Sequence, residues 1–75
     1  MSERPKKRSV TIKKHSTSVT LEDTFWTSLN EIAGKENKGI NQLITEIDEN
    51  KNKDNGLASA VRVFTLNYYK LENKI

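Results

Sequence analysis

Residues 8–26 read RSVTIKKHSTSVTLEDTFW, and the spacing of apolar residues in this stretch decides the fold. Val10 and Ile12 alternate with polar residues, and Val19 and Leu21 do so again. A period of two residues is typical of β-strands with one buried face. The first part of the stretch is therefore predicted to be extended.

The extended region covers residues 9–21, and β-branched side chains that suit a pleated sheet dominate it. It forms either one long strand or two short strands broken near Lys14 and His15. Because a lone strand leaves its backbone hydrogen-bonding groups unpaired, we expect two chains to pair their strands across a twofold axis. The predicted ribbon is antiparallel, has two strands and joins two subunits.

Three helical segments are expected after the extended region, because the apolar period changes to that of a helix. The first covers about residues 22–36, a break at 37–39 separates it from the second, and a polar loop at 49–55 precedes the third. Their apolar stripes are Phe25, Leu29 and Ile32; Ile40, Leu43, Ile44 and Ile47; and Leu57, Val61, Phe64, Tyr68 and Leu71. The predicted fold class is mostly α with a short N-terminal β-strand.

The composition predicts that one chain cannot build a large core. Only 33% of the 75 residues are hydrophobic, and short chains bury a small share of their surface. The absence of cysteine and the single histidine exclude disulfides and zinc sites built from thiolates or several histidines. We therefore expect a second copy to complete the core, since Val19, Leu21, Ile40 and Ile44 would face water in a monomer.

Charge is segregated along the chain. Residues 1–15 carry six basic side chains against Glu3, whereas the remaining residues carry seven basic and nine acidic ones. Residues 1–8 include the only proline and have no apolar period, so they are predicted to form a flexible basic arm in front of a domain at 9–75. A basic arm on a slightly acidic body indicates a polyanionic partner.

Several function classes are disfavoured. Apolar runs of two or three residues predict neither a membrane span nor a secretory signal, so the expected location is the cytoplasm. His15 has no carboxylate close in sequence, and the three glycines are too scattered for a phosphate-binding loop. We expect no enzyme activity, no catalytic residue, no metal and no cofactor.

Side-chain alternation divides the predicted ribbon into two faces. The odd-numbered residues from Thr17 to Leu21 would face the helices, whereas Ser16, Ser18 and Thr20 would point outward. A two-stranded ribbon fits the major groove of B-DNA, where small hydroxyls bond to base edges and a threonine methyl contacts the thymine methyl. The outward side chains are therefore candidate base contacts.

Three segments taken in order resemble the ribbon-helix-helix (MetJ/Arc-type) repressors, in particular a group of short bacterial proteins with a third helix. They are residues 8–26, INQLITEID at 40–48 and SAVRVF at 59–64. The resemblance implies an obligate homodimer whose outward strand side chains contact bases and whose second helix holds a DNA phosphate at its N-terminus. By position, the implied base contacts are Ser16, Ser18 and Thr20.

The expected phosphate contacts combine basic residues with the start of the second helix. They are Arg4, Lys6, Lys7, Arg8, Lys13, Lys14, Lys38, Gly39, Ile40 and Asn41. A helix N-terminus attracts anions, Gly39 permits close approach, and Asn41 either caps the helix or donates to the phosphate. The expected dimer core consists of Val19, Leu21, Trp26, Leu29, Ile40 and Ile44.

The chain departs from the resembled family beside His15. Relatives often have Gly before this histidine and Arg after it, whereas this chain has Lys14 and Ser16. A bidentate contact from arginine to guanine is thereby lost, which leaves the DNA sequence that the chain prefers open.

Two alternatives belong to other classes. A helix-turn-helix motif would place its turn at 37–39, but Lys35 stands where that motif usually has a small residue. An antitoxin or antirepressor would bind a partner protein through the third helix, although the regular apolar stripe of that helix favours its own fold. The sequence therefore predicts a homodimeric, sequence-specific double-stranded DNA-binding protein, a bacterial transcriptional repressor associated with the nucleoid that inserts a β-ribbon into the major groove.

Overall fold

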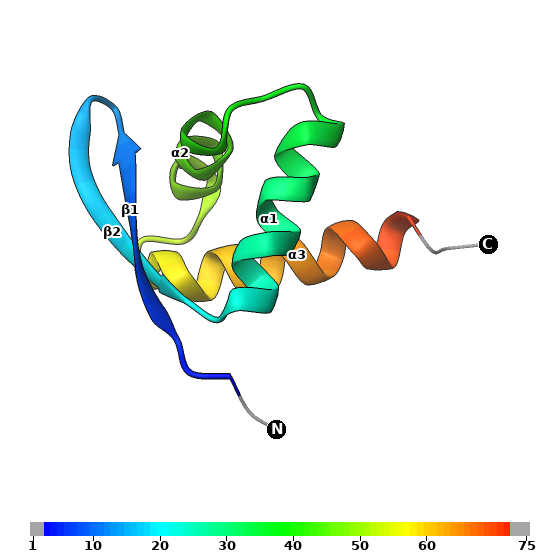
Figure 1. Ribbon diagram of the computed structural model, residues 1–75. Coiled ribbons are helices and arrows are strands. Elements are labelled where there is room, and N and C mark those ends of the chain that lie inside the picture. The colour runs from blue at the N-terminus through cyan, green and yellow to red at the C-terminus, as the bar shows by residue number, and fades with distance from the viewer. Residues whose placement is uncertain (1–2, 73–75) are drawn as a thin grey trace.

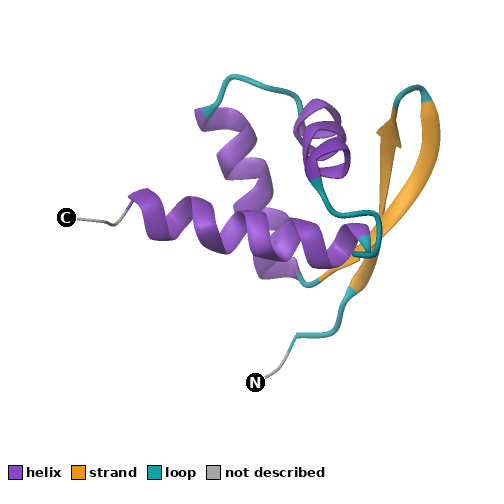
Figure 2. Ribbon diagram, turned by 180° about the vertical axis from the view of Figure 1, so that it is seen from behind, coloured by secondary structure: helices purple, strands orange, loops and turns teal. Residues whose placement is uncertain are grey.

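The computed structural model describes residues 3–72, in which a β-hairpin precedes three helices (Figure 1). The elements are β1 (Lys6–Ile12), β2 (His15–Leu21), α1 (Asp23–Lys35), α2 (Ile40–Asn50) and α3 (Leu57–Glu72). The hairpin lies along one side of the molecule, and the helices pack together on the other (Figures 1 and 2). The predicted helices are confirmed, although α2 continues into the segment expected to be a loop.

The extended region forms two strands, which resolves the alternative left open by the sequence. β1 and β2 pair antiparallel within one chain, from Ile12 opposite His15 to Lys6 opposite Leu21. Lys13 and Lys14 connect them with φ angles of 51° and 69°. Two successive positive φ angles define the tight turn whose twist matches that of a hairpin. In this chain the ribbon is intramolecular, so the prediction of a ribbon formed by one strand from each of two subunits is corrected.

The boundary predicted at residue 8 also changes. β1 begins at Lys6, so the last three residues of the expected arm belong to a strand of the folded domain. Glu3 accepts hydrogen bonds from the backbone N–H and the hydroxyl of Thr24, which ties the segment before β1 to the start of α1. Residues 1–2 of the expected arm lie outside the described residues.

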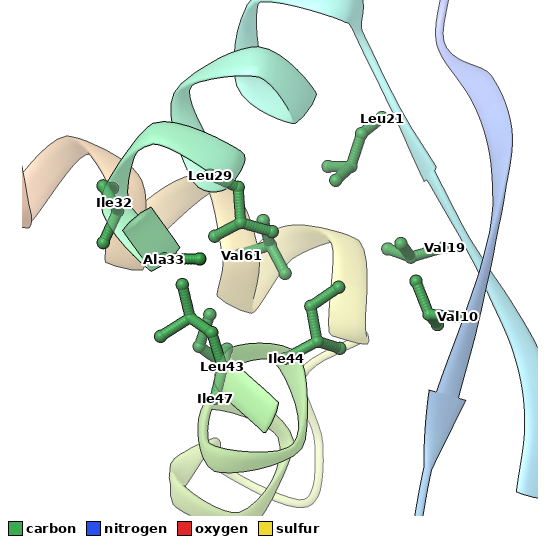
Figure 3. Packing of buried hydrophobic residues seen from close by; sticks show 10 residues of the cluster. All are labelled: Val10, Val19, Leu21, Leu29, Ile32, Ala33, Leu43, Ile44, Ile47 and Val61. Atoms are coloured by element: carbon green, nitrogen blue, oxygen red, sulfur yellow. The ribbon is translucent and has the colours of Figure 1, made fainter. Parts of the chain in front are cut away.

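The core lies between the hairpin and the three helices (Figure 3). It comprises Val10, Val19, Leu21, Leu29, Ile32, Ala33, Leu43, Ile44, Ile47 and Val61. Inward-pointing residues of both strands meet apolar stripes of α1, α2 and α3, as the two- and 3.6-residue periods predict.

This core corrects the expectation that the chain needs a partner to cover its apolar residues. Val19 is 3% exposed, and Leu21, Leu29 and Ile44 are fully buried within a single chain. Ile40 and Trp26, which were also assigned to a dimer core, are half-buried. The cover comes from α3, which packs on α1, α2 and β2, and from β1, which packs on α2.

The connection between α1 and α2 depends on Asn37, not on Gly39. Asn37 has a φ of 59°, its N–H donates to the Gly34 carbonyl at 3.2 Å, and the Lys38 N–H donates to the Ala33 carbonyl at 2.9 Å. These two bonds form the Schellman arrangement that ends many helices. Gly39 has a φ of −71°, which any residue adopts, so the turn itself does not require glycine there.

Candidate nucleic-acid interface

One face of the hairpin points away from the helices and carries almost only hydroxyl groups. Strand alternation and the register place six side chains on it, and we call this set the outer face: Lys7, Ser9, Thr11, Ser16, Ser18 and Thr20. Five of the six side chains are exposed, and Ser18 is half-buried. The outer face contains no acidic and no apolar side chain, so its hydrogen-bonding groups are available to a polar ligand.

The predicted outward set of Ser16, Ser18 and Thr20 therefore lies on one surface. Opposite them on β1 lie Thr11, Ser9 and Lys7, in that order, which was not predicted from the sequence. The alternation of polar residues in β1 was the signal that a second row existed.

The hairpin is strongly basic. Residues 6–21 contain five lysine or arginine side chains and no carboxylate. Among residues 3–72, ion pairs engage Lys6, Arg8 and Lys13 but not Lys7 or Lys14. Lys13 lies 3.6 Å from Glu49 and remains largely exposed. Positive charge is therefore retained on the outer face and at the turn that ends it.

Arg8 lies on the inward side of β1, as Lys6 does, but it is the only basic residue of the hairpin that is not exposed. Its guanidinium donates to the Leu21 carbonyl at 3.1 and 3.3 Å, pairs with Asp23 and lies 5.6 Å from the centroid of the Trp26 ring. These contacts join β1, the end of β2 and α1. Arg8 thus serves the fold, and we withdraw it from the expected phosphate contacts.

Acid is expected to weaken the attachment of the hairpin to α1. Hydrogen bonds from Arg8, and then from Lys6, hold the pKa of Asp23 below its ordinary value of 3.8. A carboxylate with a lowered pKa stabilises the fold above its ordinary pKa, and this contribution is lost as the pH falls through the lower value of the folded state. Melting temperatures measured from pH 6 to pH 2 should therefore fall less for Asp23→Asn than for the wild type, and equal losses would contradict this role.

The start of α2 lies beside β1, but its side chains are already engaged. Lys38 Nζ lies 2.6 Å from a Glu46 carboxylate oxygen, so its charge is balanced within the chain. The Asn41 side-chain oxygen accepts a hydrogen bond from the Thr11 N–H at 3.0 Å, and no side chain caps the helix. The N–H groups of Ile40, Asn41 and Gln42 open α2 and, as at the start of any helix, have no partner within the helix, so the expected phosphate site stays a prediction.

A second arginine that the sequence analysis missed attaches α3 to the start of α1. Arg62 donates to both carboxylate oxygens of Glu22 at 3.0 and 3.1 Å and lies 5.8 Å from the centroid of the Phe25 ring. The sequence did contain a sign of this role, because Arg62 is the only charged residue in the segment SAVRVF, whose other residues are apolar or small. This pair supports the fold and lies apart from the outer face.

The turn stores backbone strain at the basic end of the hairpin, because Lys13 and Lys14 adopt a conformation that favours Asn and Gly. The double change Lys13→Asn and Lys14→Gly is expected to raise the free energy of unfolding by about 1 kcal/mol. The same change removes two exposed positive charges from the turn. Thermal melts measure the effect on stability, and a variant no more stable than the wild type would contradict strain at this turn.

The model of the ribbon-helix-helix domain family matches residues 5–69. The chain belongs to the ribbon-helix-helix family. Domains of this family generally bind DNA in transcription regulators and antitoxins, and they typically dimerise. The hairpin followed by helices agrees with the family fold, which removes the helix-turn-helix alternative. No curated protein and no solved structure matched the chain.

Two further features of the structure concern α3. A groove of about 340 Å³ lies between α2 and α3 and is lined in part by Leu43, Ile47, Ala60 and Phe64. Leu71, predicted to face inward, is 72% exposed.

Within residues 3–72, no helix combines the length and apolar character needed to cross a membrane.

Proposed function

We propose that this ribbon-helix-helix chain binds double-stranded DNA in a sequence-specific manner as a homodimer. It acts as a bacterial transcriptional repressor in the cytoplasm, where DNA binding places it on the nucleoid. The observation that carries the proposal is the outer face, with five hydroxyl side chains in two rows beside Lys7 and Lys14, which form no ion pair within residues 3–72. Hydroxyls accept from and donate to base edges, while lysines neutralise phosphates.

The proposed dimer forms along the free edge of β2. Hydrogen-bonded and non-hydrogen-bonded residue pairs alternate in an antiparallel sheet, and the Thr11 N–H points away from β2 to reach Asn41. By register, the backbone groups of Ser16, Ser18 and Thr20 then point away from β1. Proteins usually protect such an edge with proline, a bulge or lysine, and β2 contains none of these between its ends.

A second copy that pairs β2 with β2 about Ser18 gives a sheet of four strands, in place of the two-stranded ribbon expected from the sequence. Four strands spaced about 4.8 Å apart extend over roughly 14 Å, whereas the major groove is about 12 Å wide. The two central β2 strands therefore enter the groove and present Ser16, Ser18 and Thr20 to the bases. The flanking β1 strands lie over its rims, where Lys7 meets phosphates.

The remaining proposed phosphate contacts surround this sheet. Lys13 and Lys14 lie at the turn, and Arg4 is exposed just before β1. In each subunit of the proposed dimer, the N–H groups at the start of α2 bind one DNA phosphate next to the groove that the sheet occupies. Lys6 pairs with Asp23, but its side chain stays 61% exposed and remains in the proposed set.

The experiment that tests the proposed function starts from a pool of random duplexes. Repeated selection on the purified chain should enrich one palindromic sequence, because two copies related by a twofold axis contact two half-sites. Binding to the enriched duplex is expected to be at least about a thousandfold tighter than to random duplexes at the same salt concentration. An unenriched pool, or equal affinity for both duplexes, would contradict sequence-specific binding.

A second candidate function, binding of a partner protein in the manner of an antitoxin or antirepressor, is favoured by α3. Val63, which lines the groove between α2 and α3, is 57% exposed, and Leu66 one turn further along α3 is 58% exposed. Leu66→Lys is expected to match the wild type in dimer mass and in DNA affinity if this surface serves a partner. A loss of either property would assign Leu66 to the dimer or to DNA and remove the support for a partner.

A further inference from the structure

Asn41 joins two parts of the proposed DNA interface. It lies in the first turn of α2, and its side-chain oxygen accepts the Thr11 N–H at 3.0 Å across 30 positions of sequence. A helix cap would use this oxygen to accept a backbone N–H of α2, but the oxygen accepts the Thr11 N–H and no side chain caps the helix. A donor to phosphate would use the side-chain NH2 group instead.

The hydrogen bond between Thr11 and Asn41 attaches the edge of β1 to α2. Thr11 pairs with Ser16 across the hairpin, and its N–H points outward from the two-stranded sheet. Thr11 also contributes its side chain to the outer face. The bond therefore fixes the distance between that face and the start of α2 at a position close to Ser16.

We propose that Asn41 is a positioning residue that holds the outer face in register with the start of α2. The inference rests on the proposed DNA-binding function. Contacts to phosphates set the position of a protein on the duplex, and contacts to base edges supply the sequence preference. A shift between the two parts misaligns hydrogen bonds to bases, which depend on direction, and alters electrostatic attraction to phosphates far less.

Three variants separate this role from other uses of the side chain. Asn41→Ala removes the acceptor, whereas Asn41→Asp keeps an acceptor for Thr11 but places a negative charge beside the DNA. Thr11→Pro removes the N–H donor without touching the ladder to β2, because that N–H points away from β2. Thr11→Val is its control, since it loses the hydroxyl and keeps the N–H.

The first measurement uses the free protein and needs no DNA. Amide hydrogen exchange at Thr11 is expected to be faster by about two- to tenfold in Asn41→Ala, which is the effect of losing one hydrogen bond. It should stay near the wild-type rate in Asn41→Asp and in the neighbouring control Gln42→Ala. Unchanged exchange in Asn41→Ala would overturn the inference whatever the DNA experiments give.

The second measurement is the ratio of affinities for the enriched and random duplexes. We expect the ratio to fall at least fivefold in Asn41→Ala and in Thr11→Pro, with no further fall in the double variant. Asn41→Asp should bind both duplexes more weakly and keep the ratio. Failure of the wild type to prefer any duplex refutes the proposed function. A wild-type preference that Asn41→Ala retains refutes the positioning role alone.

Discussion

Replacing Ser18 by proline is expected to leave a folded monomer that binds DNA about 10²- to 10⁴-fold more weakly than the wild type. The Ser18 N–H lies on the free edge of β2, so proline removes no hydrogen bond to β1. Its ring does block the approach of a second β2 strand. The loss of affinity follows because each monomer then engages one half-site alone. Sedimentation at micromolar concentration and circular dichroism measure the mass and the helical content.

Ser18→Ala is the matched control, because it removes the hydroxyl and keeps the N–H of the strand edge. It should sediment as a dimer. A dimeric Ser18→Pro variant would show that the edge of β2 is not the interface between subunits. Should Ser18→Pro lose helical content, Ser16→Pro blocks the same edge nearer the turn and decides the matter by its mass.

The second large effect is expected for Gly39→Val at the start of α2. A Cβ atom added at this position meets no atom within 4 Å, and a φ of −71° suits valine. The melting temperature should therefore change by only about 4 to 8 °C, which corresponds to roughly 1 kcal/mol for a poorer residue before a helix. Affinity should fall at least about tenfold on all duplexes, because the branched side chain covers the N–H groups proposed to bind phosphate.

Gly56→Val is the matched control for this change. Gly56 likewise precedes a helix, α3, and has open space around it, but we assign it no DNA contact. If Gly39→Val binds DNA as tightly as the wild type, the start of α2 is not part of the DNA interface. We expect Lys38→Ala to have a smaller effect on DNA affinity than Gly39→Val, because Glu46 already balances the Lys38 charge.

The helices were predictable from sequence because their apolar residues follow a helical period. The hairpin was harder to predict, since Lys13 and Lys14 occupy a turn that usually takes Asn and Gly. The start of β1 was obscured for a different reason. Arg8 occupies an inward position of the strand, where its charge is satisfied by Asp23, the Leu21 carbonyl and the Trp26 ring. Charged residues at such positions break the alternation on which strand prediction depends.

The candidate site was predictable where it depends on strand alternation, and not where it depends on distant partners. The outward positions of Ser16, Ser18 and Thr20 follow from the period of two. The bond from Thr11 to Asn41 joins residues 30 positions apart, and no local pattern indicates it. The expected dimer core assumed that its apolar residues face water in a single chain, and this assumption was wrong. The cover that α3 provides depends on the tertiary fold, which no local sequence pattern indicates.

The central claim is that the outer face recognises bases, and one comparison tests it most directly. The dissociation constants of the wild type and of Ser18→Ala are measured on the enriched duplex and on random duplexes at one salt concentration. We expect Ser18→Ala to weaken binding to the enriched duplex by about 1 to 3 kcal/mol, roughly 5- to 150-fold, and to leave binding to random duplexes nearly unchanged. Equal losses on both duplexes, or no loss on either, would contradict it.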